Sequence, residues 1–198
     1  MKKYPVNKGK DGNLEIRDSI QSKVTKLLDH VCEKHSKVLA VRYDVHYPSD
    51  HMVSGDNRDI SRHSAKLVQL YKRQGLDPHY LWVREEGQRG ENPHYHCMLF
   101  LNGHKVRKYN HVFNNAEKLW QSTLGVEQGG LIDHCTKGKR GDSHENGMLI
   151  SKSDPNFENR FDAVHHQASY VSKESTKAPA KDGLRDIGMS RITSSAKK

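Results

Sequence analysis

One short stretch constrains the fold more than any other, because two histidines flank a bulky residue at the head of an apolar run: Pro93-His94-Tyr95-His96-Cys97-Met98-Leu99-Phe100-Leu101. Aromatic and large aliphatic residues between turn-forming segments favour a buried β-strand. Alternate side chains of a strand share a face, so His94 and His96 point one way while Tyr95 and Cys97 point the other. Two imidazoles on one face can chelate a divalent ion. With 14 histidines in 198 residues, a chance pair on a half-buried strand is the alternative.

The charge balance indicates a polyanionic partner. The chain carries 33 lysines and arginines against 24 acidic residues, a formal charge of +9. In one domain with a single core, this excess favours nucleic acid. A basic but merely solvated surface is the alternative.

The cysteines and the N-terminal residues indicate the cellular compartment. The 3 cysteines are odd in number, far apart and never in CxxC spacing, which argues against a disulfide framework or a zinc ribbon. The N-terminus lacks the apolar core of a signal peptide, and no apolar run approaches about 18 residues. We therefore expect a soluble cytoplasmic protein without a membrane partner.

Hydrophobic periodicity predicts alternating helices and strands behind a basic flexible arm at 1–13. Helices are expected at 14–36, 60–73, 109–121 and from 159, strands at 38–47, 79–86, 93–101 and 131–132, a loop at 136–148 and a disordered tail at 193–198. Strand 79–86 should pair with the histidine strand as an antiparallel hairpin, because only a turn-rich segment separates them. That pairing brings an acidic residue towards the histidines.

Two further segments carry polar residues in patterned positions. Strand 38–47 places Arg42, Asp44 and His46 on one face, which predicts either a functional surface or a wetted edge strand. Near the C-terminus, helical spacing puts Tyr170 and Lys173 on a common face.

The order of these segments resembles that of HUH endonucleases. An acid on one strand, His94-Tyr95-His96 on the next and Tyr170-Val171-Ser172-Lys173 downstream match the family hallmarks, a His-hydrophobe-His strand and a tyrosine helix often reading YxxK. The closer similarity is to replication initiators of filamentous-phage type, the inovirus replication-protein-like family. It is carried by Trp82-Val83-Arg84-Glu85, the histidine strand, the stretch 168–177 and Gly188-Met189-Ser190-Arg191.

The resemblance implies a divalent cofactor, Mg²⁺ or Mn²⁺, held by His94, His96 and Glu85. Attack on a phosphodiester needs a cation to neutralise charge at phosphorus, and two imidazoles with one carboxylate leave coordination positions open. The third ligand stays open at this point. Glu85 ends the WxRE-like signature, whereas the remaining candidates are Glu86, Asp44 and Glu174.

The resemblance also implies that Tyr170 is the nucleophile and that Lys173 stabilises its phenolate or the crowded phosphorane. Only one tyrosine lies in the motif, which predicts a single-tyrosine mechanism. Helper tyrosines remain possible at Tyr4, Tyr43, Tyr47 and Tyr109.

DNA contacts are expected from Arg42, Arg84, Lys177 and Arg191. The implied partners are single-stranded or hairpin origin DNA, with a host helicase and polymerase, acting on a monomer or weak dimer in the cytoplasm of a bacterial host.

These expectations combine into an α/β (α+β) domain over 14–192. It has a central antiparallel sheet of about four or five strands, helices packed on one face as in the HUH palm, and an open face for metal and DNA. The expected function is that of a metal-dependent single-strand DNA nickase and ligase that initiates rolling-circle replication of a phage, prophage or plasmid. The alternatives are a non-enzymatic nucleic-acid-binding module and an HUH transposase or relaxase.

Overall fold

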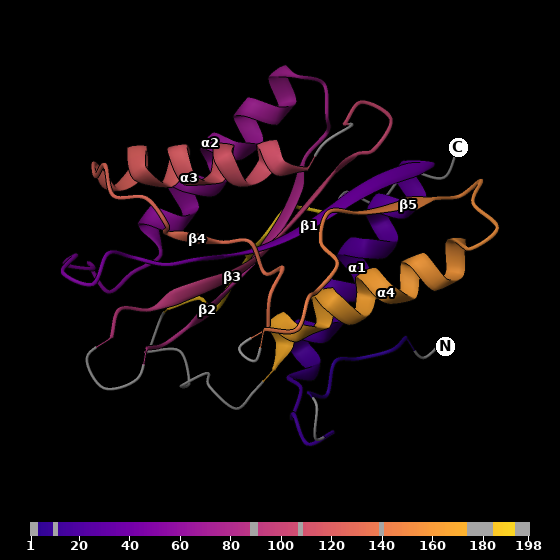
Figure 1. Ribbon diagram of the computed structural model, residues 1–198, viewed down its shortest axis with the longest axis horizontal. Helices are drawn as coiled ribbons and strands as arrows, with labels where there is room; N and C mark the ends of the chain where they lie inside the picture. The colour runs from indigo at the N-terminus through magenta and orange to yellow at the C-terminus, as the bar shows by residue number, and fades with distance from the viewer. Residues whose placement is uncertain are drawn as a thin grey trace.

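The computed structural model describes residues 4–9, 12–87, 91–106, 109–138, 141–173 and 184–192. Helices and strands alternate along these ranges (Figure 1). In chain order they are α1 (Asp18–Lys34), β1 (Lys37–Val45), α2 (Arg58–Arg73), β2 (His79–Glu85), β3 (His94–Asn102), α3 (Asn110–Leu124), β4 (Ile132–Asp133), β5 (Met148–Ser151), α4 (Phe157–Ser169), a 3₁₀ turn (Tyr170–Ser172) and β6 (Ile187–Met189).

The strands form an antiparallel sheet in the order β4-β1-β3-β2-β6, and β5 pairs with the first half of β1. The histidine strand β3 therefore lies at the centre. The predicted hairpin is confirmed, because β2 pairs with β3 and places Glu85 opposite His94. The predicted antiparallel α+β class is also confirmed, with a sheet of 6 strands in the part of the chain that the structure describes.

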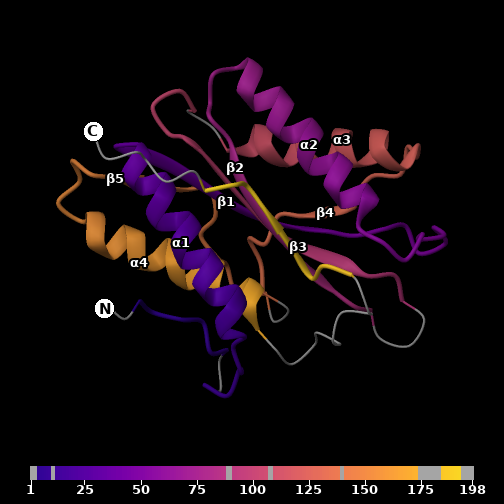
Figure 2. The same ribbon diagram turned by 180° about the vertical axis from the view of Figure 1, so that it is seen from behind.

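Helices cover both faces of the sheet, so the expectation of helices on one face was wrong. Figures 1 and 2 show α2 with α3 on one side and α1 with α4 on the other. The physical reason lies in β3, where Cys97 and Leu99 pack with the α2/α3 core while Met98 and Phe100 pack with the α1/α4 core. A strand that is apolar on both faces needs a hydrophobic layer on each.

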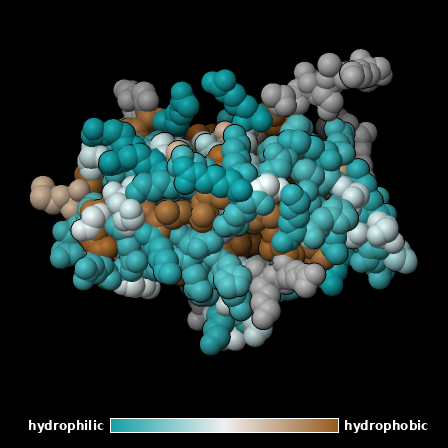
Figure 3. Space-filling model, turned by 90° about the horizontal axis from the view of Figure 1, so that it is seen from above, coloured by the Kyte–Doolittle hydropathy of each residue, from teal (hydrophilic) through white to brown (hydrophobic). Residues whose placement is uncertain are grey.

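The outer surface above α2 and α3 is mainly polar, with hydrophobic atoms showing in a band across its middle (Figure 3). Beneath it, the fully buried Trp120 anchors α3, and its Nε1 donates a hydrogen bond to the carbonyl oxygen of His46, 2.7 Å away. The end of β1 is thereby tied to the α2/α3 layer.

Two short strands were missed, and one segment is more tightly packed than expected. β5 begins at the end of the predicted loop 136–148, and β6 lies in the stretch noted only as a signature, because strands this short show no alternation. In the predicted flexible arm, residues 4–9 lie against α4. The Tyr4 ring is 5.1 Å from that of Phe161, and the Asn7 backbone N–H donates to Ser169 Oγ at 2.7 Å. The predicted tail 193–198 lies outside the described residues.

Within the described ranges, no helix has both the length and the apolar character needed to cross a membrane.

A buried histidine in α2 should make stability depend on pH. His63 is fully buried, and burial followed by the charge of Lys66 lowers its pKa from 6.5 to about 3. Between these two pH values the His63 imidazole is protonated in the unfolded chain but not in the folded chain. The free energy of unfolding therefore falls as pH falls through this window. Between pH 7 and pH 4.5 this group should lower the free energy of unfolding by about 2–3 kcal/mol.

The substitution His63→Leu should remove this contribution, and urea unfolding at both pH values measures it. The exposed His111 on α3 provides a matched control, because His111→Leu makes the same substitution on the surface of the α2/α3 layer instead of in its core. An equal loss of stability between pH 7 and pH 4.5 in wild type and His63→Leu would contradict the assignment.

Candidate active site

The polar residues predicted for the site gather at one end of the α1/α4 face of the sheet. Strand pairing places Asp44 opposite His96 and Glu85 opposite His94. Because side chains alternate, these residues share the face that carries apolar Met98 and Phe100 farther along β3. Three strands that are separate in sequence thus bring their polar ends together where the apolar α1/α4 core stops.

Glu85 and the two histidines form a compact group of possible metal ligands. Glu85 Oε2 lies 2.6 Å from His96 Nε2 and 3.7 Å from His94 Nε2. One ligand atom from each of the three residues lies within 4.8 Å of the others. Neighbouring ligands of an octahedral ion with bonds of 2.0–2.1 Å are about 3 Å apart, so small side-chain rotations would let these three atoms hold one ion. Two imidazoles and a carboxylate suit a divalent metal.

Asp44 orients His96 from the other side of the ring. Its Oδ2 lies 2.9 Å from His96 Nδ1 and 3.2 Å from an amino group of Arg42. Burial disfavours charge on both groups, but their mutual attraction outweighs it, raising the pKa of His96 and holding that of Asp44 well below its usual range. With Asp44 at Nδ1, the His96 ring turns Nε2 towards Glu85, an orientation that carboxylate partners of metal-binding histidines commonly impose.

Geometry separates the candidates for the third ligand. Glu86 Oε1 pairs with Arg84 Nε at 2.7 Å, and Asp44 reaches the far nitrogen of His96. Glu174 lies outside the described residues. Among the described candidates, Glu85 is the carboxylate that lies near the Nε2 atoms of both histidines.

His46 joins the group without having been assigned to it from the sequence. Its ring stacks on that of His94, with centroids 5.2 Å apart and an interplanar angle of 11°. Burial, followed by the charge of His96, lowers the pKa of His94 to about 4. The His94 ring is therefore neutral at neutral pH, as a metal ligand must be. The sequence placed His46 on the polar face of its strand, but it did not show that this strand, β1, pairs with β3.

Tyr170 and Lys173 reach this group from the end of α4. The Tyr170 ring lies 5.5 Å from the His96 ring, and Lys173 Nζ donates to the Tyr170 hydroxyl at 3.1 Å. The same Nζ lies 3.5 Å from Glu85 Oε2. The predicted contact between Tyr170 and Lys173 is confirmed, although a 3₁₀ turn rather than a continuing helix produces it.

Helix α1 holds this turn in place. The Arg17 backbone N–H donates to the carbonyl oxygen of Ser172 at 2.8 Å, and Ser172 Oγ donates to Gln21 Oε1 at 2.6 Å. Both hydrogen bonds hold Ser172, the last residue of the turn, against the start of α1, which limits the movement of Tyr170 relative to the histidines.

A groove of about 990 Å³ opens beside Tyr170. Arg42, Asp44 and the N-terminal residue Asn7 contribute to its lining. The Arg42 guanidinium lies over the Tyr170 ring, 4.1 Å from its centroid. A positive charge is therefore present at the point where a chain entering the groove would meet the tyrosine.

Residues 2–190 match the YagK/YfjJ C-terminal domain family. The chain belongs to this family. No curated protein matches it. The family name states no activity, so the resemblance to HUH endonucleases and their replication initiators remains a prediction.

In this YagK/YfjJ C-terminal domain, the residues predicted to contact DNA lie in different environments. Arg42 is in the groove and Arg191 is exposed after β6. Arg84 is buried, and its guanidinium donates to the Tyr95 hydroxyl at 3.2 Å and to Asn57 Oδ1 at 3.3 Å. The prediction for Arg84 was wrong, because it precedes Glu85 on β2 and so points to the opposite face. Lys177 lies outside the described residues.

The candidate helper tyrosines lie away from the groove. Tyr43 and Tyr47 are buried in the α2/α3 core. Tyr4 packs on Phe161, and Tyr109 packs on Phe113 with ring centroids 5.9 Å apart. These contacts leave Tyr170 as the tyrosine that meets the His96 ring in the described residues of this YagK/YfjJ C-terminal domain.

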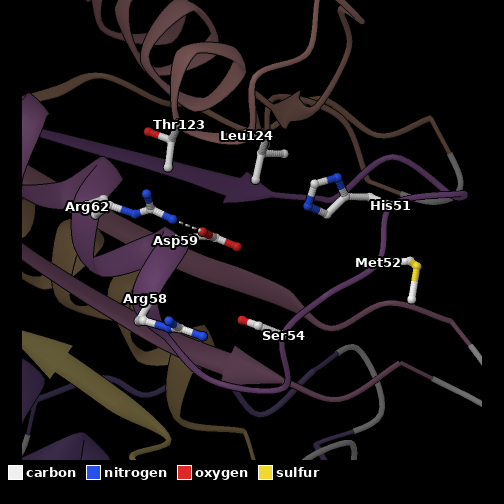
Figure 4. Close-up of a pocket in the computed structure, with 8 residues that line it drawn as sticks. All are labelled: His51, Met52, Ser54, Arg58, Asp59, Arg62, Thr123 and Leu124. Carbon is white, nitrogen blue, oxygen red and sulfur yellow. Dashed lines mark hydrogen bonds and ion pairs between the residues drawn. The ribbon is translucent and has the colours of Figure 1, made fainter.

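A separate pocket of about 300 Å³ lies between the start of α2 and the end of α3 (Figure 4). Arg62 and Asp59 form an ion pair of 2.8 Å in its lining, to which Arg58 also contributes. None of the residues predicted for the site lines this pocket. In this family member the pocket is therefore separate from the candidate site at the histidine strand.

Proposed function

We propose that the chain is a metal-dependent single-strand DNA nickase and strand transferase that forms a covalent 5′-phosphotyrosine through Tyr170. In this proposal the nick starts rolling-circle replication of a phage, prophage or plasmid. The activity rests on the site's geometry, whereas the replication role rests on the resemblance to initiators of filamentous-phage type.

One observation carries the proposal: Lys173 Nζ lies between the Tyr170 hydroxyl at 3.1 Å and the Glu85 carboxylate at 3.5 Å. The Lys173 ammonium therefore contacts both the Tyr170 phenol and the carboxylate of the His/Glu group. A phenol becomes an effective nucleophile when a nearby cation stabilises its deprotonated form. A tyrosine that only packed at the edge of the core would not need this arrangement.

The proposed step is a transesterification at phosphorus. The Tyr170 oxygen forms the new P–O bond, its proton passes to solvent, and the bond from phosphorus to the 3′ oxygen breaks. The departing oxygen takes a proton and becomes a free 3′-hydroxyl. Because one phosphodiester replaces another, the bond energy is kept for later rejoining and no nucleotide cofactor is required.

His94, His96 and Glu85 would hold Mg²⁺ or Mn²⁺, which would neutralise charge on the non-bridging phosphate oxygens. Lys173 stabilises the Tyr170 phenolate, and Arg42 lies over the ring, where it can meet the phosphate that the tyrosine attacks. The +9 formal charge supports attraction of a nucleic acid strand, and the exposed Arg191 adds to it.

The test is covalent capture of DNA. The purified chain, incubated with a random-sequence single-stranded DNA pool and Mn²⁺, should give a protein–DNA adduct that survives denaturing electrophoresis. The adduct should be absent with EDTA, and released fragments should carry 3′-hydroxyl ends that a polymerase can extend. Sequencing the trapped DNA then identifies the cleavage site.

Tight DNA binding without an adduct would refute the nickase and favour the nucleic-acid-binding module. An adduct with a free 5′ end instead of a free 3′-hydroxyl would refute the proposed polarity. If the trapped DNA came from transposon ends or transfer origins, the same chemistry would belong to an HUH transposase or relaxase, and the replication role would be wrong.

A further inference from the structure

We propose a second metal site, for Zn²⁺, formed by His35, Asp77 and His79 at the opposite end of β2 from the candidate active site. One ligand atom from each of these residues lies within 4.8 Å of the others. Two imidazoles and one carboxylate are a common ligand set for zinc, with the remaining position left to water.

The three residues come from different elements and converge on one oxygen. His35 follows the last residue of α1, Asp77 lies in the turn after α2, and His79 begins β2. Asp77 Oδ2 lies 2.7 Å from His35 Nε2 and 3.4 Å from His79 Nε2. His79 is buried, so its ring cannot swing away into solvent.

The backbone at Asp77 is held in an unusual conformation that directs the carboxylate into the cluster. Its φ is 45°, in the left-handed region that residues with a side chain rarely adopt. Two backbone hydrogen bonds fix the preceding residue, one from Leu76 N to the carbonyl oxygen of Tyr71 and one from Asn102 N to the carbonyl oxygen of Leu76. Strain of this kind persists where surrounding contacts determine the conformation, and it often marks functional positions.

A cation already approaches the same carboxylate. Lys34 Nζ lies 2.6 Å from Asp77 Oδ2, and nearly half of the Lys34 side chain is exposed. Its long stem can therefore swing into solvent and give its place to a metal ion. His30 lies on the same helix as Lys34, and its ring is 5.3 Å from that of His79, so a third imidazole borders the cluster.

The proposed zinc site is independent of the nickase. His79 and Glu85 are the two ends of β2, six residue steps apart, and at about 3.3 Å per step the two clusters are about 20 Å apart. Zinc here would join the C-terminal end of α1 to the start of β2 and so stabilise the α1 side of the sheet. By mass action, zinc at about a hundred times its Kd should raise the thermal midpoint by about 5–10 °C.

The test uses Zn²⁺ alone as the probe, in calorimetric titration of the full chain. The double substitution His94→Gln with Glu85→Gln first disables the other His/Glu group. On this background we expect one bound zinc with a micromolar or tighter Kd. Asp77→Asn should weaken binding at least tenfold, and it suits the fold because asparagine also tolerates the left-handed region.

Two further variants separate a zinc site from a simple ion-pair network. Lys34→Met should tighten zinc binding at least threefold, because it removes the competing cation, whereas His35→Gln should weaken it even if Asp77→Asn folds poorly. His104→Gln is the matched control, since this histidine bonds to Ser36 Oγ beside the cluster and should not affect zinc affinity. The proposal is overturned if the background protein binds no zinc, or if Asp77→Asn and His35→Gln bind it as well as their parent.

Discussion

Tyr170→Phe should form no covalent adduct with single-stranded DNA and release no 3′-hydroxyl fragment. The substitution removes the one oxygen that would attack phosphorus and keeps the ring that packs against His96 and under Arg42. Losing the hydroxyl's hydrogen bond with Lys173 should cost only about 1 kcal/mol of stability. Denaturing electrophoresis with end-labelled DNA measures the adduct, and Mn²⁺ titration should show metal affinity close to that of wild type.

Lys173→Met separates the role of the cation from that of the nucleophile. The adduct should still form, but at a rate about a hundredfold to a thousandfold lower, because one stabilising donor to the developing charge is lost. Tyr109→Phe is the matched control, since Tyr109 packs on Phe113 away from the groove and should nick normally. Full nicking by Tyr170→Phe would place the nucleophile elsewhere, and Tyr4, Tyr43, Tyr47 and Tyr109 would then be tested in turn.

Glu85→Gln and His94→Ala should each reduce Mn²⁺-dependent cleavage by more than about a hundredfold while leaving DNA affinity within a few fold. Each removes one ligand from the group that would hold the ion, whereas binding of the DNA strand is distributed over many basic residues. Cleavage is measured on the captured sequence, and affinity by fluorescence anisotropy at several salt concentrations. Binding should fall steeply as salt rises.

Glu86→Gln is the matched control for the third ligand, because Glu86 pairs with Arg84 and not with the histidines. Normal cleavage by Glu85→Gln together with loss in Glu86→Gln would show that the wrong carboxylate was chosen. His94 is a cleaner target than His96, since His96 lies between the carboxylates of Asp44 and Glu85. Its removal would leave two buried charges without their shared partner, at a cost of about 3–5 kcal/mol.

His96 links three strands of the sheet. Its ring connects β1 to β2 across β3 through contacts of 2.9 Å to Asp44 and 2.6 Å to Glu85. Tyr170 and Lys173 then close over this connection from the α4 side. The candidate site is therefore part of the packing of the domain, which restricts how far its side chains can move.

Local patterns in the sequence were enough to predict much of the candidate site. Alternation along one strand placed His94 and His96 on a common face, and the short turn-rich connection predicted that β2 would pair with β3 and bring an acidic residue to the histidines. The choice of Glu85 among the acidic residues came from the resemblance. Spacing of three residues predicted that Tyr170 and Lys173 would meet. These features depend on how side-chain directions repeat along the backbone, every two residues in a strand and about every three and a half residues in a helix. A short segment shows such a repeat by itself.

Features that join distant segments could not be predicted in this way. Pairing of β1 with β3 decided that Asp44 contacts His96 and that His46 stacks on His94. The pairing of β2 with β3 decided which of its faces points to which helical layer. Arg84, predicted to contact DNA, is therefore buried with Tyr95 on the face opposite to Glu85.

The sequence by itself thus determined the class of fold and the residues that meet within a strand, a hairpin or a helical turn. Only the tertiary structure decided that helices cover both faces, that the 3₁₀ turn brings Tyr170 to the His96 ring, and that His35, Asp77 and His79 converge. The physical reason is that backbone periodicity is local. Which strands pair and which ends of elements meet depends on how the whole chain buries its apolar surface.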